Sequence, residues 1–187
     1  MLVIDDVLPS LVFDRFKLLT VDNPNFTFGV CRTTTMTDNV KSFFKEPQPN
    51  TWDFEYFSIP LVTALSNTKA VKLKELLRIR FGLLHRDVKQ IINTPHVDRP
   101  TEPHFVGLYY LNDTDGATKI WKQKLKDWSE ETNRPSLDDC ELLHEIEPKA
   151  NRMVIFDGSH FHSSVTPTKT QLRYVINYNY TFDIIGE

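Results

Sequence analysis

A two-residue hydrophobic period begins at Leu76 and recurs as far as Phe182, and it restricts the possible folds more than any other feature of the chain. In residues 76–84 apolar side chains alternate with two arginines and a glycine, so an extended strand would have one apolar and one cationic face. Further strands are expected at residues 104–111, 118–121, 141–147, 152–156, 160–165 and 172–182, each bounded by turn residues. Many short strands separated by turns are typical of sandwiches and barrels.

The first 75 residues have a helical period instead. Apolar residues at near-helical spacing predict one helix over residues 9–19 and a second over residues 54–66. Pro60 is expected in the first turn of the second helix, where proline is tolerated. Residues 32–53 have no clear period and are expected to be mostly loop.

Two helices followed by many short strands favour a mainly β fold with N-terminal helices, a double-stranded β-helix, which is the jelly-roll barrel that cupins also use. The 187 residues correspond to a single domain. We divide it into a helical support region, residues 1–75, and a jelly-roll core, residues 76–182. Residues 122–139 are strongly charged and are expected to form a solvated helix-plus-loop insertion, either a lid or a surface excursion.

Composition excludes several classes of protein. Apolar residues make up 40% and charged residues 25%, which is ordinary for a soluble globular domain. The net charge of −3 argues against nucleic-acid binding through bulk charge, although not against a local basic groove. No apolar run is long enough to span a membrane, and the N-terminus is too acidic for a secretory signal. Cys31 and Cys140 are expected to be separate thiols, and a cytoplasmic location is the default.

A metal site is predicted by three residues. His96 and Asp98 are two positions apart, so in an extended segment their side chains point to the same face. A third ligand from a distant strand, His162, completes two histidines and one carboxylate on one side of an ion, as in non-haem Fe(II) oxygenases. His160 is also two residues from His162, so by parity alone either histidine can face inward.

Arg173 predicts an anion site on the last strand. It stands among apolar residues, and an arginine in such a strand is rarely buried without an anionic partner. Its planar guanidinium suits a carboxylate, for example one end of a dicarboxylate cosubstrate. Asn177 and Asn179 share its strand face by parity and would suit contacts with a cosubstrate or peptide. The two arginines of residues 76–84 are expected either in solvent or at the barrel mouth, where an anion would bind.

Three motifs resemble those of the 2-oxoglutarate- and Fe(II)-dependent dioxygenase superfamily, in particular its prolyl-hydroxylase-like branch. They are HVD at residues 96–98, YYLND at residues 109–113 and HSSVTPTKTQLR at residues 162–173. The resemblance covers roughly residues 76–182 and implies the same double-stranded β-helix. It also implies that His162, rather than His160, is the third ligand of Fe(II), because of its spacing to the proline and to Arg173. Tyr110, the second tyrosine of YYLND, would donate its hydroxyl to the 2-oxoglutarate carboxylate that Arg173 binds.

The chain departs from that branch about ten residues before His96, where an aromatic residue is common and Arg86 stands here. The cosubstrate pocket would then be completed differently, with Arg80 as the candidate. The implied activity is hydroxylation of an unactivated C–H bond with Fe(II), 2-oxoglutarate and O2, and ascorbate is a candidate additional cofactor. Prolyl residues of a peptide or protein are the expected substrate. A free amino acid, a nucleobase, or a non-catalytic cupin-like metal-binding module are the alternatives.

Overall fold

The computed structural model describes residues 1–23, 29–30, 42–68, 71–127 and 135–184. Within them ten strands form two antiparallel sheets. The large sheet has the order β1 (Leu2–Ile4), β8 (Arg152–Asp157), β5 (Phe105–Tyr110), β10 (Leu172–Ile184), β4 (Val71–His85), β3 (Ser42–Lys45) and β2 (Gly29–Val30). The small sheet has the order β7 (Leu142–Ile146), β6 (Thr118–Lys124) and β9 (His160–Ser164).

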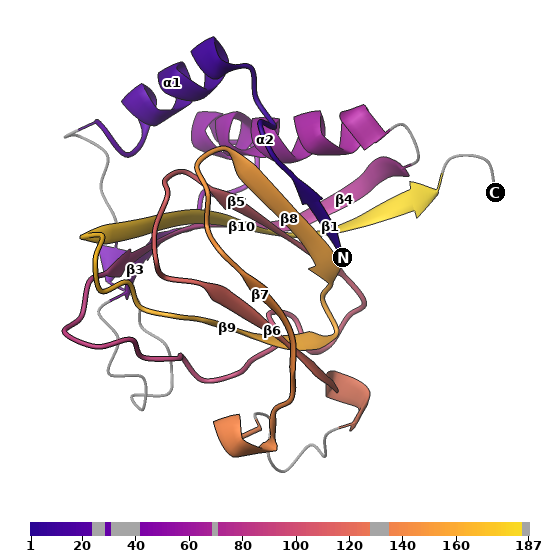
Figure 1. Ribbon diagram of the computed structural model, residues 1–187. Coiled ribbons are helices and arrows are strands. Elements are labelled where there is room, and N and C mark those ends of the chain that lie inside the picture. The colour runs from indigo at the N-terminus through magenta and orange to yellow at the C-terminus, as the bar shows by residue number, and fades with distance from the viewer. Residues whose placement is uncertain (24–28, 31–41, 69–70, 128–134, 185–187) are drawn as a thin grey trace.

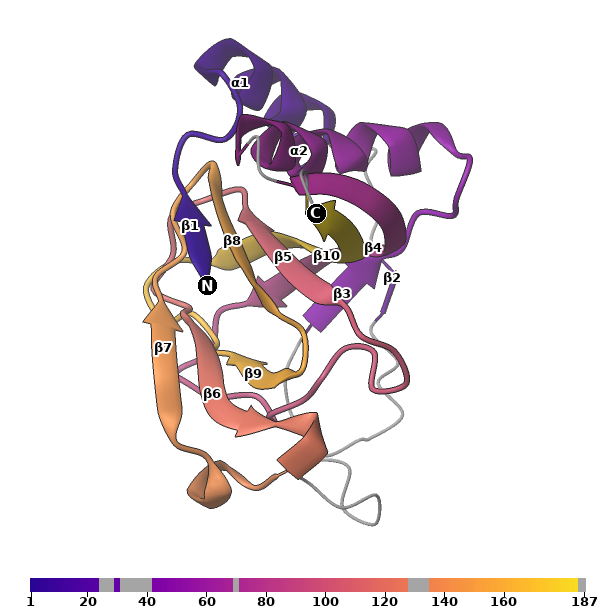
Figure 2. The ribbon, with the colours of Figure 1, turned by 90° about the vertical axis from the view of Figure 1, so that its right-hand side faces the viewer.

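The two sheets face each other, and both helices lie on the other side of the large sheet (Figures 1 and 2). This arrangement confirms the predicted double-stranded β-helix with N-terminal helices. Between the sheets lies a buried apolar cluster that includes Val106, Leu108, Ile120 and Phe156. The inner face of the large sheet therefore forms the wall of the barrel in which the predicted site residues lie.

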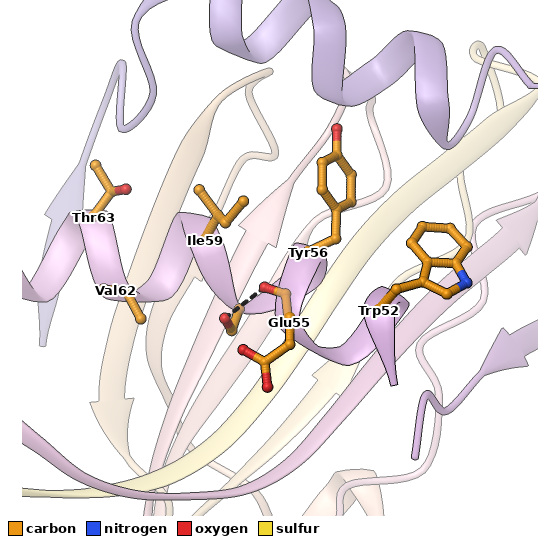
Figure 3. A pocket seen from close by; sticks show the side chains of 7 residues that line it. Trp52, Glu55, Tyr56, Ile59, Val62 and Thr63 are labelled. Carbon is orange, nitrogen blue, oxygen red and sulfur yellow. Dashed lines mark hydrogen bonds between the residues drawn. The ribbon is translucent and has the colours of Figure 1, made fainter. Parts of the chain in front are cut away.

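The helices α1 (Ser10–Leu19) and α2 (Trp52–Thr68) bury the outer face of the large sheet. Phe16 and Phe57 are fully buried against sheet residues that include Phe81 and Tyr178. Neither helix of the described chain combines the length and apolarity needed to cross a lipid bilayer. The outer surface of α2 has a shallow, largely apolar hollow, lined in part by Trp52 (Figure 3), on the side of the sheet away from the barrel interior.

The prediction for Pro60 was wrong. Pro60 lies inside α2, beyond the first turn that starts at Trp52. Pro60 is buried, and because it has no N–H it leaves the carbonyl of Tyr56, four residues earlier, without the usual helical donor. Burial against the sheet outweighs the local preference of proline for the first turn.

Two strand boundaries also differ from the prediction. β3 lies in the segment expected to be loop and pairs with residues 81–84 of β4; residues 32–41 of that segment lie outside the described chain, as does Cys31. β4 begins at Val71 rather than at residue 76. The cause is an irregularity in its pairing with β10 between Asn179 and Tyr180, because a bulge shifts the two-residue period by one position.

The charged insertion was predicted as helix plus loop from residue 122. Instead β6 continues to Lys124, and single 3-10 turns follow at Leu125–Asp127 and Leu137–Asp139. Residues 128–134 lie outside the described chain. Cys140, directly after the second turn, is a partly buried free thiol.

Asp115 ties the turn before β10 to the loop after β5. Its carboxylate accepts hydrogen bonds from the backbone N–H groups of Thr168 (2.9 Å), Lys169 (3.0 Å) and Thr170 (3.2 Å), and from both threonine hydroxyls. Burial would raise the pKa of Asp115, but these hydrogen bonds outweigh it and hold the pKa well below its ordinary value. The ionised carboxylate therefore fixes the chain as it enters the strand that carries Arg173.

We expect Asp115→Asn to lower the free energy of unfolding at pH 7 by about 1–3 kcal/mol, because charge-assisted hydrogen bonds are lost. A carboxyl group whose pKa is lowered in the folded state stabilises it above the unfolded pKa, near 4, and less as the pH falls further. Urea unfolding at pH 7 and pH 3 should show the difference between variant and unaltered protein narrowing at pH 3. Asp138→Asn, at an exposed carboxylate, should change little; an equal loss there would contradict the assignment.

Candidate functional site: a metal cluster and a carboxylate clamp

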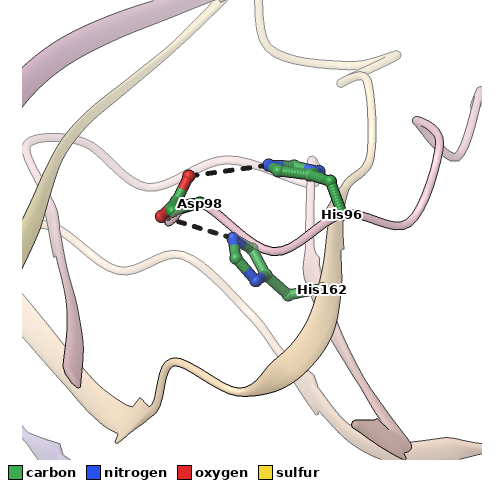
Figure 4. A group of neighbouring side chains, drawn as sticks. All are labelled: His96, Asp98 and His162. Carbon is green, nitrogen blue, oxygen red and sulfur yellow. Dashed lines mark ion pairs between the residues drawn. The ribbon is translucent and has the colours of Figure 1, made fainter. Parts of the chain in front are cut away.

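His96, in the segment between β4 and β5, forms an isolated β-bridge with His162 of β9. The N–H of His96 donates to the carbonyl of His162 (3.1 Å), and the N–H of His162 donates back (3.0 Å), so the imidazole centroids lie 4.6 Å apart. Asp98, two residues after His96, points to the same place. Its carboxylate oxygens lie 3.8 Å from His96 Nε2 and 3.7 Å from His162 Nε2 (Figure 4). One ligand atom from each residue falls within 4.8 Å of the others, close enough for a single ion.

Both imidazoles are oriented for ligation through Nε2. Nδ1 of His96 lies 3.1 Å from the carbonyl of Thr94, and Nδ1 of His162 lies 3.4 Å from that of His160. Donation from Nδ1 assigns the lone pair to Nε2, and a backbone partner of this kind is common for histidines that bind metal. His162 is 4% exposed, and its buried Nε2 has no hydrogen-bond partner among the described residues. Burial and the neighbouring His96 lower the pKa of His162 to about 4, so it is neutral at pH 7.

Asp98 is held from three sides. Its side chain is 3% exposed, and Oδ1 lies 2.8 Å from Nη2 of Arg78, while Oδ2 accepts hydrogen bonds from the side-chain amides of Asn177 and Asn179, both at 2.9 Å. Burial would raise the pKa of Asp98, but the adjacent imidazoles and the guanidinium of Arg78 hold it well below its ordinary value. Asp98 is therefore an oriented anion at neutral pH.

This arrangement changes the roles expected for three polar residues. Asn177 and Asn179 were predicted to contact a cosubstrate or peptide, but their amides donate to Asp98. Arg80 was predicted to complete the cosubstrate pocket; its Nε lies 2.5 Å from Glu46 and its guanidinium lies over the ring of Phe44, 4.7 Å from the centroid. Both partners come from the region of β3, which the sequence pattern did not reveal.

We call His96, Asp98 and His162, the three candidate metal ligands, the metal cluster. His160 lies outside it. Its Nδ1 is 2.8 Å from the carbonyl of Trp121, and it pairs with Lys124 across the small sheet. Arg86, at the position where an aromatic residue was expected, is exposed just after β4. Within β4, the residue that pairs with Arg173 of β10 is Leu84.

Arg173 is buried in the barrel, 3% exposed. Its Nη2 donates to Thr118 Oγ1 (2.7 Å), and its guanidinium lies over the ring of Tyr110, 5.5 Å from the centroid. The Tyr110 hydroxyl is 2.8 Å from the same Thr118 oxygen. Arg173 Nε is buried without a hydrogen-bond partner, and no carboxylate of the described chain forms an ion pair with Arg173. Burial accordingly lowers the pKa of this guanidinium, which stays positive and lacks an anion.

We call the connected group of Arg173, Tyr110 and Thr118 the clamp. It shares one wall of the barrel with the metal cluster. Arg173 and Asn177 lie on the same face of β10, four residues apart, which is about 13 Å along a strand. Between them lies Val175, opposite Tyr110, and Leu108 lies opposite Asn177. The guanidinium of Arg173, an apolar stretch and the group of candidate metal ligands thus follow one another along the inner wall.

These residues fit a divalent iron ion and a dicarboxylate. Two neutral imidazoles and one carboxylate are the donor set of non-haem Fe(II) sites, and the orphaned Nε2 of His162 provides a buried lone pair for it. The unpaired guanidinium of Arg173 fits the carboxylate at the far end of the dicarboxylate. Sequence reasoning missed Arg78 and Thr118. The alternating arginines gave a signal for Arg78, whereas nothing in the local sequence distinguished Thr118.

Comparison with known proteins gives an independent result. Residues 82–181 match the family described as the 2OG-Fe(II) oxygenase superfamily. No curated protein sequence matches the chain.

Solved structures with the same fold include a prolyl hydroxylase from Trichoplax adhaerens in complex with a hypoxia-inducible-factor peptide fragment. It is 13% identical, with a TM-score of 0.63, over 96% of this chain and 82% of that one. A Pseudomonas putida prolyl-4-hydroxylase is also 13% identical, with a TM-score of 0.62, over 96% and 90%. HygX from Streptomyces hygroscopicus, with nickel and 2-oxoglutarate bound, is 14% identical, with a TM-score of 0.60, over 96% and 81%. At these identities the likeness establishes the fold.

Proposed function

Since the chain belongs to the 2OG-Fe(II) oxygenase superfamily, whose members use Fe(II), 2-oxoglutarate and O2, we propose that it hydroxylates a prolyl residue in a peptide or protein. We assign His96, Asp98 and His162 as the iron ligands, and Arg173, Tyr110 and Thr118 as the clamp for 2-oxoglutarate. The observation that carries the proposal is the buried guanidinium of Arg173. A structural metal site has no need of an unpaired cation on the same wall, whereas a dicarboxylate cosubstrate does.

Each group of residues has a defined task in this reaction. His96, Asp98 and His162 would hold the iron through two imidazole nitrogens and one carboxylate oxygen, the ligand set of non-haem Fe(II) oxygenases. Arg173 and the Tyr110 hydroxyl orient the far carboxylate, and the apolar wall at Val175 and Leu108 excludes water. The bound iron supplies the oxidising chemistry, which turns 2-oxoglutarate and O2 into succinate and CO2 as one oxygen atom enters the substrate C–H bond.

The prolyl substrate is supported by the YYLND motif and by the two prolyl hydroxylases among the solved structures of this fold. Other proteins of this fold act differently: the non-haem α-ketoglutarate-dependent SnoN, with a TM-score of 0.63, is an epimerase. A fold does not determine a substrate. Prolyl peptides are therefore the first arm of a substrate screen, and small molecules, free amino acids and nucleobases are the others.

The proposal predicts a spectroscopic and a chemical result. Anaerobic addition of Fe(II) and 2-oxoglutarate should give the weak visible charge-transfer band of the chelate, and admission of oxygen should yield succinate. Proline-containing peptides should raise succinate formation and gain one oxygen atom, measured by mass spectrometry. Metal binding with neither band nor succinate would instead favour a non-catalytic cupin-like module.

His162→Ala and His160→Ala make a matched pair for this assay. His162→Ala should lose the band because it removes a ligand. His160→Ala should keep the band, since the His160 side chain contacts the Trp121 carbonyl, and the His160 backbone carbonyl that faces His162 Nδ1 is retained in alanine. Loss of the band in His160→Ala with retention in His162→Ala would reverse the assignment of the third ligand.

A further inference from the structure

We propose that Arg78 tunes the charge of the metal site so that metal alone binds weakly and the dianionic cosubstrate binds tightly. The inference rests on the proposed function and adds a residue that neither ligates the metal nor belongs to the clamp. Arg78 extends from β4 opposite Asn179 of β10 and ends beside Asp98.

The contact between Arg78 and Asp98 is close and shielded from solvent. Nη2 and Oδ1 are 2.8 Å apart, and the two side chains are 18% and 3% exposed. Charges in such a site interact more strongly than at a surface because little water screens them. Asp98 is the carboxylate with which Arg78 pairs within the described part of the chain, so the positive charge of Arg78 is directed at the metal position.

Two other cationic side chains, Arg80 and Lys124, are each paired with a different carboxylate and not with Asp98. Arg80, two residues along β4, is paired with Glu46, and Lys124 is paired with Asp157. An imidazole that binds a metal ion does so in its neutral form, so His96 and His162 add no charge to the metal-bound site. Among the described residues, the charges placed at the metal position are therefore the negative charge of Asp98 and the positive charge of Arg78, which offsets it.

The positive charge of Arg78 lowers the affinity of the site for the metal ion and raises its affinity for 2-oxoglutarate. A divalent cation is repelled by Arg78, so its affinity for the site is lower than two imidazoles and an unpaired carboxylate would give. The end of 2-oxoglutarate that chelates the metal carries a carboxylate and is attracted by the same guanidinium. If Arg78 only held Asp98 in place, its loss would instead weaken the binding of both the metal ion and 2-oxoglutarate. Asn177 and Asn179 continue to hold Asp98 when Arg78 is changed.

The test is titration calorimetry with Ni(II) as an oxygen-stable metal, followed by 2-oxoglutarate added to the Ni(II)-loaded protein. Arg78→Gln should bind Ni(II) about tenfold more tightly and 2-oxoglutarate about tenfold more weakly than the unaltered protein, an order-of-magnitude expectation for one nearby charge. Arg78→Lys keeps the charge and should leave both constants within about threefold. Arg80→Gln removes a charge that is already paired, so it should leave Ni(II) affinity within about twofold.

The outcomes separate this inference from the proposed function. Weaker Ni(II) binding in Arg78→Gln, or unchanged constants for both ligands, would overturn the tuning role while leaving the oxygenase assignment intact. Failure of the unaltered protein to bind Ni(II) would overturn both. If Arg78→Gln does not fold, as judged by its melting curve, Arg78→Met is the second neutral variant, and the same opposite shifts are required of it.

Discussion

Replacing Arg173 with methionine is expected to abolish 2-oxoglutarate binding and, at the same time, to stabilise the ligand-free protein. The guanidinium is 3% exposed and has no carboxylate partner in the described chain, so folding removes it from water without providing a counter-charge. Apolar replacement of buried charges is often stabilising, and we expect a gain of about 1–2 kcal/mol. For a chain of this length that corresponds to a rise in Tm of about 3–6 °C.

The loss of binding has the same physical origin. In the proposed function, 2-oxoglutarate provides the anion that Arg173 lacks, so in the variant the far carboxylate of 2-oxoglutarate would be buried and unpaired. We expect the affinity for 2-oxoglutarate to fall about 100-fold or more, measured by calorimetry on the Ni(II)-loaded protein. Tyr110 and Thr118 remain hydrogen-bonded to each other, which limits the structural damage.

Arg152→Met is the matched control. Arg152 lies on β8 opposite Tyr110, but its guanidinium pairs with Asp5 at 2.6 Å and also donates to the carbonyl of Glu147. Its loss should therefore lower Tm and leave 2-oxoglutarate binding within about threefold. A fall in Tm for Arg173→Met, with binding retained, would show that Arg173 is an ordinary structural residue and would remove the main support for the clamp.

Part of the site could be predicted from the sequence because strand geometry and residue type alone point to it. His96 and Asp98 are separated by two residues, and the geometry of an extended chain alone directs both to one place. Arg173 was recognised because a cation in an apolar strand is unusual in any register. The fold followed from the two-residue period, which sheet burial imposes on every strand of the core.

Arg78, Arg80 and Thr118 depended on which strands lie next to one another. Arg78 reaches Asp98 because β4 pairs with β10 in a register that sets it opposite Asn179. Arg80 pairs with Glu46 because the short segment Ser42–Lys45 adds a strand beside β4, and this segment has too few residues to show a period. Contacts between distant segments of this kind are a property of the tertiary fold, and no local pattern encodes them.

Asp98→Asn should have the largest combined effect on metal binding and stability. The amide keeps the shape of the side chain but removes the charge, so binding of Fe(II) or Ni(II) should be lost. The metal-free protein should also be destabilised, by roughly 2–4 kcal/mol, because Arg78 becomes a poorly solvated cation without a partner and an amide N–H₂ would face the donors Asn177 and Asn179. Urea unfolding in the presence of a chelator measures this loss without any contribution from metal.

The double variant Asp98→Asn with Arg78→Met separates the two roles of the carboxylate. Removing the cation should recover a large part of the lost stability, since the unpaired charge is its main cause, while metal binding should stay absent because a ligand is still missing. Additive losses in the double variant would mean that Asp98 and Arg78 stabilise the fold independently, against the 2.8 Å ion pair. Recovery of stability without recovery of metal binding would establish Asp98 as both the counter-ion of Arg78 and a ligand of the metal, and so connect the packing of β4 and β10 directly to the chemistry of the site.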